Sequence, residues 1–71
     1  MLNLYKNIKK RRLELELTQS DLAQKLGYSD KSMIAKIEKG SIDLPQSKIS
    51  AFAKALNTSE IELMGYVEGV D

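Results

Sequence analysis

Cysteine and histidine are both absent from this chain of 71 residues. Without cysteine the chain forms no disulfide and no thiolate-bound metal site, and without histidine it lacks the commonest metal ligand and the usual general base near neutral pH. The acidic residues are scattered, and no pair of a nucleophile and a base is evident. We therefore expect no metal, no other cofactor and no enzymatic activity.

Long apolar runs are missing as well. No stretch approaches the roughly 18 consecutive apolar residues that a transmembrane helix requires. The N-terminus is too charged between Lys6 and Arg12 to lead into the apolar core of a signal peptide. The sequence thus predicts one small cytosolic domain without a membrane partner, near the size limit where roughly 60% of the unfolded chain's surface can be buried.

Net charge is only +1, but the charge is distributed unevenly. Residues 1–40 contain nine basic and five acidic residues, a balance of +4, whereas residues 41–71 contain two basic and five acidic residues, a balance of −3. The N-terminal part is therefore the part suited to face a polyanion. Ordinary solvated helix faces would give the same distribution, so charge alone does not decide the function.

Residues 18–40 are the most informative stretch. Thr18 is suited to cap a helix, with Asp21 in its first turn, and Gly27 interrupts the helical periodicity before Gly40 ends the stretch. The pattern predicts two short amphipathic helices joined by a turn, with Tyr28 tucked beneath that turn. Their predicted buried positions are Leu22, Ala23, Leu26, Met33, Ile34 and Ile37.

The second of these helices should start at Asp30, or at Ser29, and run to Lys39. Its inner side is apolar, whereas its outer positions are short or basic. Such a surface can enter a DNA groove lined with phosphates. The outer positions are Lys31, Ser32, Ala35 and Lys36.

A preceding helix is predicted over residues 2–16, with Asn3 as a possible cap. Leu4, Ile8 and Leu15 share one face, and the gap in that face falls at Arg11 or Arg12. One arginine should therefore reach past the core edge to a carboxylate. The remaining basic side chains, including Arg11, are expected on the outer sides of the helix as solvated surface.

Two further helices complete the prediction. The loop at residues 41–45 is expected to be anchored by Ile42 and Leu44, and its proline, Pro45, suits a helix start. Ile49, Phe52, Ala53 and Leu56 then recur at helical spacing up to Asn57. A short fifth helix should be capped by Ser59 and ended by Gly65, and residues 66–71 should form a flexible tail or the start of a linker.

The segments LTQSDLAQKLG and IAKIEKG resemble the helix-turn-helix of the Cro and phage-repressor family of DNA-binding proteins, also called the XRE family. The resemblance continues through DLPQSKISAFAKALNTSEIELMG, which looks like the fourth and fifth helices of that family. It implies an all-α, compact five-helix, lambda-repressor-like DNA-binding domain over residues 1–65. Its Gly-Tyr turn is similar to that of Firmicute phage and prophage repressors.

One departure concerns that turn. The turn glycine in the family usually precedes the first buried isoleucine of the recognition helix by six positions, whereas Gly27 precedes Ile34 by seven. We interpret the extra residue as Ser29, which leaves Asp30 as the cap.

The resemblance also implies two sets of DNA contacts. Lysine can donate to guanine, serine can bond with several bases, and an alanine methyl can meet that of thymine. The implied base contacts in the major groove are Lys31, Ser32, Ala35 and Lys36. The implied contacts to the DNA backbone are Thr18, Gln19, Ser29, Lys39, Ser41 and Lys48. For Lys39 and Lys48, plain solvated surface is an equally good interpretation.

Two residues match family members in a structural role. Arg12 and Glu38 correspond to an arginine and a glutamate that pair between the first and third helices, and Gln19 corresponds to a glutamine that also braces the recognition helix. The implied function is a phage or prophage type transcriptional repressor, bound as a homodimer to a palindromic double-stranded operator. The dimer patch is expected near residues 60–70. The alternative is a protein-interaction module such as an antitoxin or antirepressor-binding domain, which the near-neutral net charge also fits.

Overall fold

The structure is a computed structural model, and it describes residues 4–65. This part of the chain forms five helices. They are α1 (Leu4–Glu14), α2 (Gln19–Leu26), α3 (Ser32–Glu38), α4 (Gln46–Ala55) and α5 (Glu60–Met64). No strand occurs among these residues, so the all-α prediction is confirmed. Asn3, the predicted tail and the end of the expected dimer patch lie outside the described residues.

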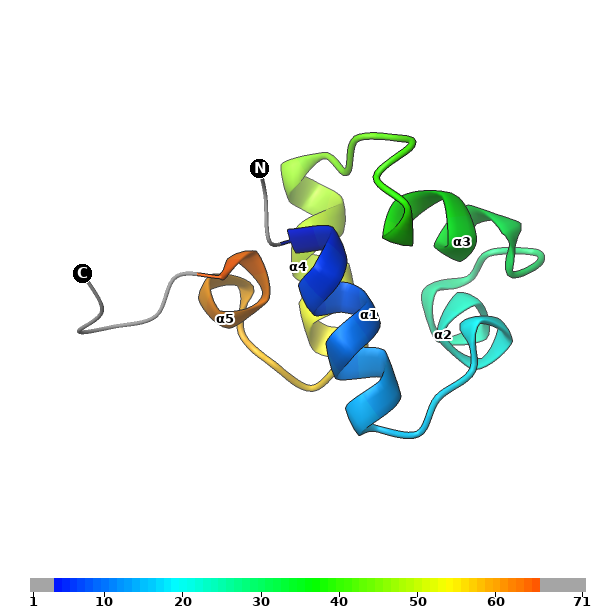
Figure 1. The fold of residues 1–71 in the computed structure, drawn as a ribbon, viewed down its shortest axis with the longest axis horizontal. Coiled ribbons are helices and arrows are strands. Elements are labelled where there is room, and N and C mark those ends of the chain that lie inside the picture. The colour runs from blue at the N-terminus through cyan, green and yellow to red at the C-terminus, as the bar shows by residue number, and fades with distance from the viewer. Residues whose placement is uncertain (1–3, 66–71) are drawn as a thin grey trace.

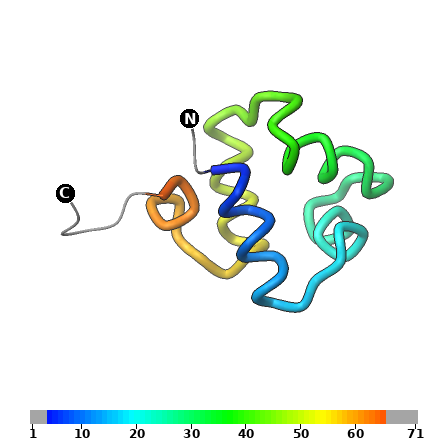
Figure 2. Tube along the Cα trace, in the orientation of Figure 1, coloured from blue at the N-terminus to red at the C-terminus, as the bar shows by residue number. Residues whose placement is uncertain are grey.

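The helices divide into two sides. Helices α2 and α3 lie on one side of the molecule and α5 on the other, while α1 contacts both α3 and α5 (Figure 1). The tube in Figure 2 follows the chain from α1 through α2 and α3 and back through α4 to α5. Helix α4 contacts both α2 and α5. The pair α2 and α3 therefore packs against α4 through α2 and against α1 through α3.

The core contains most of the apolar positions that the helical periodicity predicts, whereas Leu15 and Leu26 are only half-buried and pack against it. Ile8, Leu22, Ile34, Phe52 and Leu56 are completely buried. Burying a side chain of this size contributes about 1.5–3 kcal/mol relative to leaving it exposed. Ile42 and Leu44 pack against this core and so anchor the loop between α3 and α4, as expected.

Helix α1 is shorter than the predicted helix at residues 2–16, because it ends at Glu14. Glu16 adopts a left-handed conformation with φ 59°, and the Leu17 N–H donates to the Arg12 carbonyl at 3.0 Å. Arg12 Nη1 in turn donates to the Leu17 carbonyl at 2.8 Å. These bonds turn the chain early enough for Thr18 to cap α2.

Helix α2 has the caps that the sequence predicts. The Thr18 hydroxyl accepts from the Asp21 N–H at 2.9 Å, and Asp21 Oδ2 accepts from the Thr18 N–H at 2.9 Å. Gly27 ends the helix in the left-handed region with φ 83°. Tyr28 is half-buried after this glycine and packs against Phe52, with ring centroids 6.5 Å apart.

The start of α3 corrects the prediction. The helix begins at Ser32, not at Ser29 or Asp30, and ends at Glu38, one residue before Lys39. The N-cap residue is therefore Lys31 and not Asp30, which lies one residue earlier and accepts the Ser32 N–H at 2.8 Å.

Helices α4 and α5 follow the prediction closely. Pro45 lies immediately before α4, and Asn57 stops that helix with φ 56°. Ser59 and Glu62 form a capping box at the start of α5, and Gly65 ends it with φ 91°.

Arg11 was expected on the solvated side of α1, and this expectation is wrong. Its Nε donates to the Leu56 carbonyl at 2.9 Å and its Nη2 to the Asn57 carbonyl at 3.0 Å. A cation at the carboxyl end of a helix satisfies carbonyls that have no partner within that helix. Arg11 thereby ties α1 to the end of α4.

Candidate nucleic-acid interface

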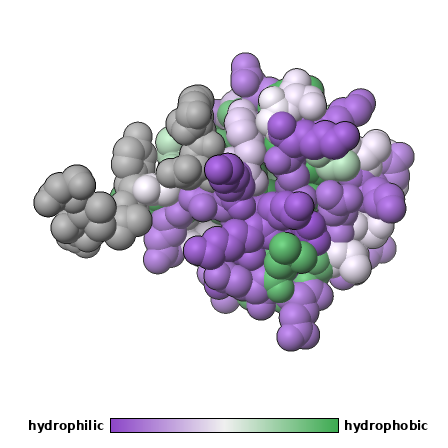
Figure 3. All heavy atoms as spheres, viewed as in Figure 1, coloured by the Kyte–Doolittle hydropathy of each residue, from purple (hydrophilic) through white to green (hydrophobic). Residues whose placement is uncertain are grey.

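Helix α3 separates its residues into a buried and an exposed side. Ile34 and Ile37 are buried in the core, and Met33 is half-buried. Lys31, Ser32 and Lys36 are exposed, as the sequence predicts, whereas Ala35, predicted on the outer side, is half-buried. Most of the surface over α1 and α3 is hydrophilic in the view of Figure 3, apart from an apolar patch near the end of α1. The exposed residues of α3, and Lys31 just before it, are thus basic or small.

A buried ion pair fixes the C-terminal end of α3 against α1. Arg12 Nε donates to Glu38 Oε2 at 2.7 Å and Arg12 Nη2 to Glu38 Oε1 at 3.1 Å. The two side chains are only 8% and 4% exposed. The predicted pair is therefore formed, in the bidentate geometry in which an arginine best matches a carboxylate.

Gln19 connects α2 to the same pair. Its Nε2 donates to Glu38 Oε1 at 3.1 Å, so Glu38 is held from two helices at once. The predicted bracing of α3 by Gln19 is therefore present. This network leaves α3 little freedom to tilt against α2.

Three of the predicted contact residues line one hollow. Thr18, Gln19 and Lys31 surround a depression of about 560 Å³ together with Arg12. This hollow lies where the start of α2 approaches the residue before α3. The structure thus brings two predicted backbone contacts beside one predicted base contact.

Asp30 and Ser32 interact at the start of α3. The Ser32 hydroxyl donates to Asp30 Oδ1 at 2.5 Å, and the same oxygen accepts the Ser32 N–H at 2.8 Å. These two bonds, with a smaller contribution from the charge of Lys36, lower the pKa of Asp30 below its ordinary value. The sequence predicts Asp30 only as a cap. An aspartate two residues before a serine is the local signal for such a bond.

The remaining predicted contacts are dispersed. Lys39 and Ser41 are exposed after α3, where the Ser41 N–H donates to the Lys36 carbonyl at 3.0 Å around Gly40. Lys48 lies elsewhere, with its Nζ 6.0 Å from the centre of the Tyr28 ring. Ser29 is exposed in the turn before α3.

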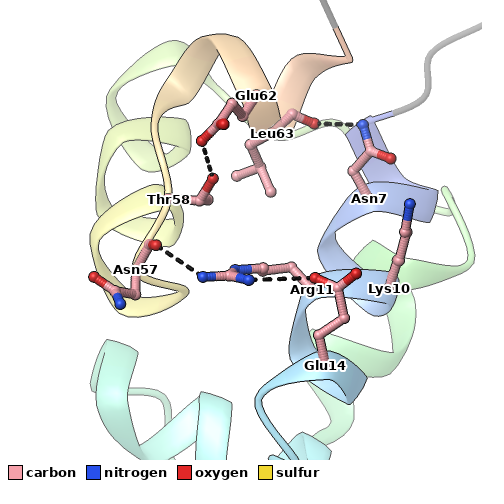
Figure 4. A pocket seen from close by; sticks show the side chains of 8 residues that line it. All are labelled: Asn7, Lys10, Arg11, Glu14, Asn57, Thr58, Glu62 and Leu63. Carbon is pink, nitrogen blue, oxygen red and sulfur yellow. Dashed lines mark hydrogen bonds and ion pairs between the residues drawn. The ribbon is translucent and has the colours of Figure 1, made fainter. Parts of the chain in front are cut away.

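A second hollow, of about 340 Å³, lies between α1 and the segment from the end of α4 to α5 (Figure 4). Arg11 points across it to Asn57, Asn7 donates to the Leu63 carbonyl at 3.0 Å, and Thr58 donates to Glu62 at 2.8 Å. These polar groups bind one another, so we interpret them as ties between helices.

Residues 4–65 contain no cluster of acidic side chains arranged to hold a metal ion. None of the helices described here is both long and apolar enough to cross a membrane.

Comparison with protein families decides the identity of the domain. A family model described as helix-turn-helix matches residues 8–63, which is most of the chain. The chain belongs to the helix-turn-helix family of the Cro type. The match runs from within α1 to within α5 and includes all of α2 and α3. A search of curated proteins finds no significant match to the chain.

Membership of the helix-turn-helix family indicates what kind of molecule the domain binds. The domain is a DNA-binding module of transcription regulation. In such modules the second helix of the motif lies in the major groove and the first supports it across the backbone. Helices α2 and α3 are the two consecutive helices of the matched region that such a motif requires.

Proposed function

We propose that this helix-turn-helix protein is a sequence-specific transcriptional repressor of phage or prophage type, similar to Firmicute repressors, that acts in the cytoplasm. The observation that supports a reading role best is the exposed side of α3, because Ser32 and Lys36 are exposed while Ile34 and Ile37 hold the same helix in the core. Ser32 and Lys36 are four residues apart and therefore lie on one helix face. That face presents a hydroxyl and an ammonium group to an incoming groove.

The proposed contacts fall into two classes. Lys31, Ser32, Ala35 and Lys36 meet base edges, and these specify the sequence. The contacts to phosphates position the domain and carry no sequence information. The proposed phosphate contacts are Thr18, Gln19, Ser29, Lys39, Ser41 and Lys48.

Repression follows from occupancy in this proposal. A protein bound at an operator that overlaps a promoter excludes RNA polymerase from the same DNA. A single module of this size buries limited contact area, so two copies on a palindromic site supply the affinity that occlusion requires.

The test compares two variants that should behave differently. Lys36→Ala should relax the preference at one base pair of a selected operator, whereas Gln19→Ala should weaken binding to all duplexes alike. The measurement is the affinity for operator and scrambled duplexes as a function of salt. Because phosphate contacts release counterions, the logarithm of the affinity should fall linearly with the logarithm of the salt concentration.

Lys54→Ala is the matched control, since Lys54 is an exposed lysine near the end of α4 outside the proposed contacts. Melting curves of the three variants separate lost contacts from lost folding, which matters most for Gln19 because it also braces Glu38. A chain that binds no duplex even at low salt would contradict the proposal and favour the protein-interaction alternative.

A further inference from the structure

The hydroxyl of Ser32 has one hydrogen, and that hydrogen is already in use. It is donated to Asp30 Oδ1 at 2.5 Å, while the same carboxylate oxygen accepts the Ser32 N–H at 2.8 Å. Hydrogen bonds from a hydroxyl to a carboxylate are shorter and roughly twice as strong as those between neutral groups. Ser32 therefore keeps its hydrogen on Asp30 when a weaker acceptor approaches.

What remains free on Ser32 is a pair of acceptor sites. A serine hydroxyl combines one donor with two lone pairs. In the major groove, adenine N6 and cytosine N4 carry donors, whereas guanine O6 and thymine O4 are acceptors. With its hydrogen engaged, Ser32 can pair with the amino bases and not with the keto bases.

Lys36 supplies the opposite polarity on the same face. Its ammonium group has only donors, and it lies four residues, or about 6 Å of helix axis, beyond Ser32. The Lys36 charge also makes a small contribution to lowering the pKa of Asp30. The exposed face of α3 thus places an acceptor and a donor about two base-pair steps apart.

We propose that Asp30 is a positioning residue that holds the Ser32 hydroxyl as an acceptor. The recognition helix then selects an amino base over the keto base of the same size, adenine over guanine or cytosine over thymine, at the base pair that Ser32 meets. This inference rests on the proposed function, because it concerns how α3 reads a duplex. Asp30 itself touches no base in this account.

The test uses the full chain and duplexes selected from a random pool. The base pair whose preference disappears in Ser32→Ala identifies the position, and duplexes with each of the four bases there are then titrated. The wild-type chain should prefer the amino base about fivefold, which corresponds to one net hydrogen bond. In Asp30→Ala this ratio should fall to near one, because the freed hydroxyl can also donate and the keto-base duplex gains affinity.

Two further variants keep the result interpretable. Asp30→Asn retains an oxygen that can accept the Ser32 N–H, but this oxygen is a neutral and weaker acceptor for the hydroxyl. It should therefore lower the preference only in part, even if Asp30→Ala frays the helix, which circular dichroism would reveal. Asp43→Ala removes a different exposed carboxylate, in the loop before α4. It should raise the affinity for all duplexes alike and leave the ratio unchanged.

Several results would overturn the inference. They are a wild-type preference for the keto base, a ratio unaffected by Asp30→Ala, or no position that depends on Ser32. If Asp30→Ala also changes the preference in a Ser32→Ala background, Asp30 reads the base directly and the inference is wrong. In each of these results the chain still binds duplex DNA, so the proposed function stands. A chain that binds no duplex at low salt would overturn the proposed function as well.

Discussion

At the scale of single residues, Arg12 places a charged group in the protein interior, which costs the free energy of its hydration. Only 7% of its surface is exposed, and the side chain of its partner, Glu38, is buried with it. Its guanidinium bonds to both Glu38 oxygens and to the Leu17 carbonyl, and these contacts offset the loss of hydration. Such a pair adds little net stability over an apolar replacement, but removing one partner leaves a buried charge without compensation.

Glu38→Ala should therefore destabilise the domain strongly. The expected loss is about 3–5 kcal/mol of unfolding free energy, a large part of the total for a domain of this size. Thermal melting followed by circular dichroism measures it.

Glu14→Ala is the matched control, because Glu14 pairs with the neighbouring arginine, Arg11, at 3.3 Å but is 49% exposed. An exposed pair of this kind contributes roughly 0.3–0.5 kcal/mol. Equal melting temperatures for Glu38→Ala and Glu14→Ala would show that the buried pair does not stabilise the domain.

The two arginines show how far sequence reasoning extends at this scale. Periodicity predicted that Arg11 or Arg12 interrupts the apolar face, and only the resemblance to known repressors assigned Arg12 to Glu38. The role of Arg11 was missed because its partners are backbone carbonyls of Leu56 and Asn57, about 45 residues away in sequence. Carbonyl partners leave no mark on the composition of either segment.

At the scale of helices, local capping decides which boundaries the sequence predicts well. Helices α2 and α5 both begin with a capping box and end at a left-handed glycine, and their predicted starts are confirmed. Helix α3 lacks such a box, and the predicted bounds of α1 and α3 are wrong by one to three residues at the ends that the structure describes. The end of α1 depends on the bonds between Arg12 and Leu17 and on the left-handed conformation of Glu16, which a residue other than glycine seldom adopts.

The capping carboxylates should make stability depend on pH. Bonds from the Thr18 backbone and hydroxyl lower the pKa of Asp21 below its ordinary value of 3.8, and the Thr58 hydroxyl with Ser59 does the same for Glu62. A carboxyl with a lowered pKa in the folded state contributes stability above its unfolded pKa and loses it as the pH falls through the folded pKa. The contribution of Asp21 should thus be complete near pH 6 and vanish well below pH 3.8.

The measurement is the melting temperature of the wild-type chain and of Asp21→Asn between pH 6 and pH 2. The wild type should melt higher at pH 6, and the difference should close in acid. Asp43→Asn changes an exposed carboxylate outside the capping boxes and should melt like the wild type throughout. A difference between wild type and Asp21→Asn that stays constant with pH would contradict the role of the ionised cap.

At the scale of the whole molecule, the excess of basic residues in the N-terminal part coincides with the helix-turn-helix. The segment before residue 41 has a balance of +4 and contains α1, α2 and α3, whereas the more acidic remainder contains α4 and α5. In the proposed function, a domain polarised in this way would meet DNA with α3, and α5 would be left for contact with a second copy. Ile61 on α5 is 63% exposed, as a contact between copies would require.

Two copies on a palindrome should bind cooperatively when the half-sites are about one helical turn apart. Inserting roughly five base pairs between them turns one half-site to the opposite face of the duplex. The second copy should then bind at least about tenfold more weakly, near the affinity for an isolated half-site. Titrations monitored by gel mobility resolve the singly and doubly bound species, and independent binding on the original palindrome would contradict a dimer on DNA.

The network at the end of α3 has a consequence for how such a domain diversifies. Glu38 and the isoleucines anchor the helix from its buried side, so the outward residues contribute little to packing. Exchanging Ser32 or Lys36 should therefore change the free energy of unfolding little. In the proposed function it changes which base edges α3 can bind. If α3 reads the operator as proposed, a lineage built on this scaffold can move to a new operator through surface substitutions alone, without first regaining lost stability.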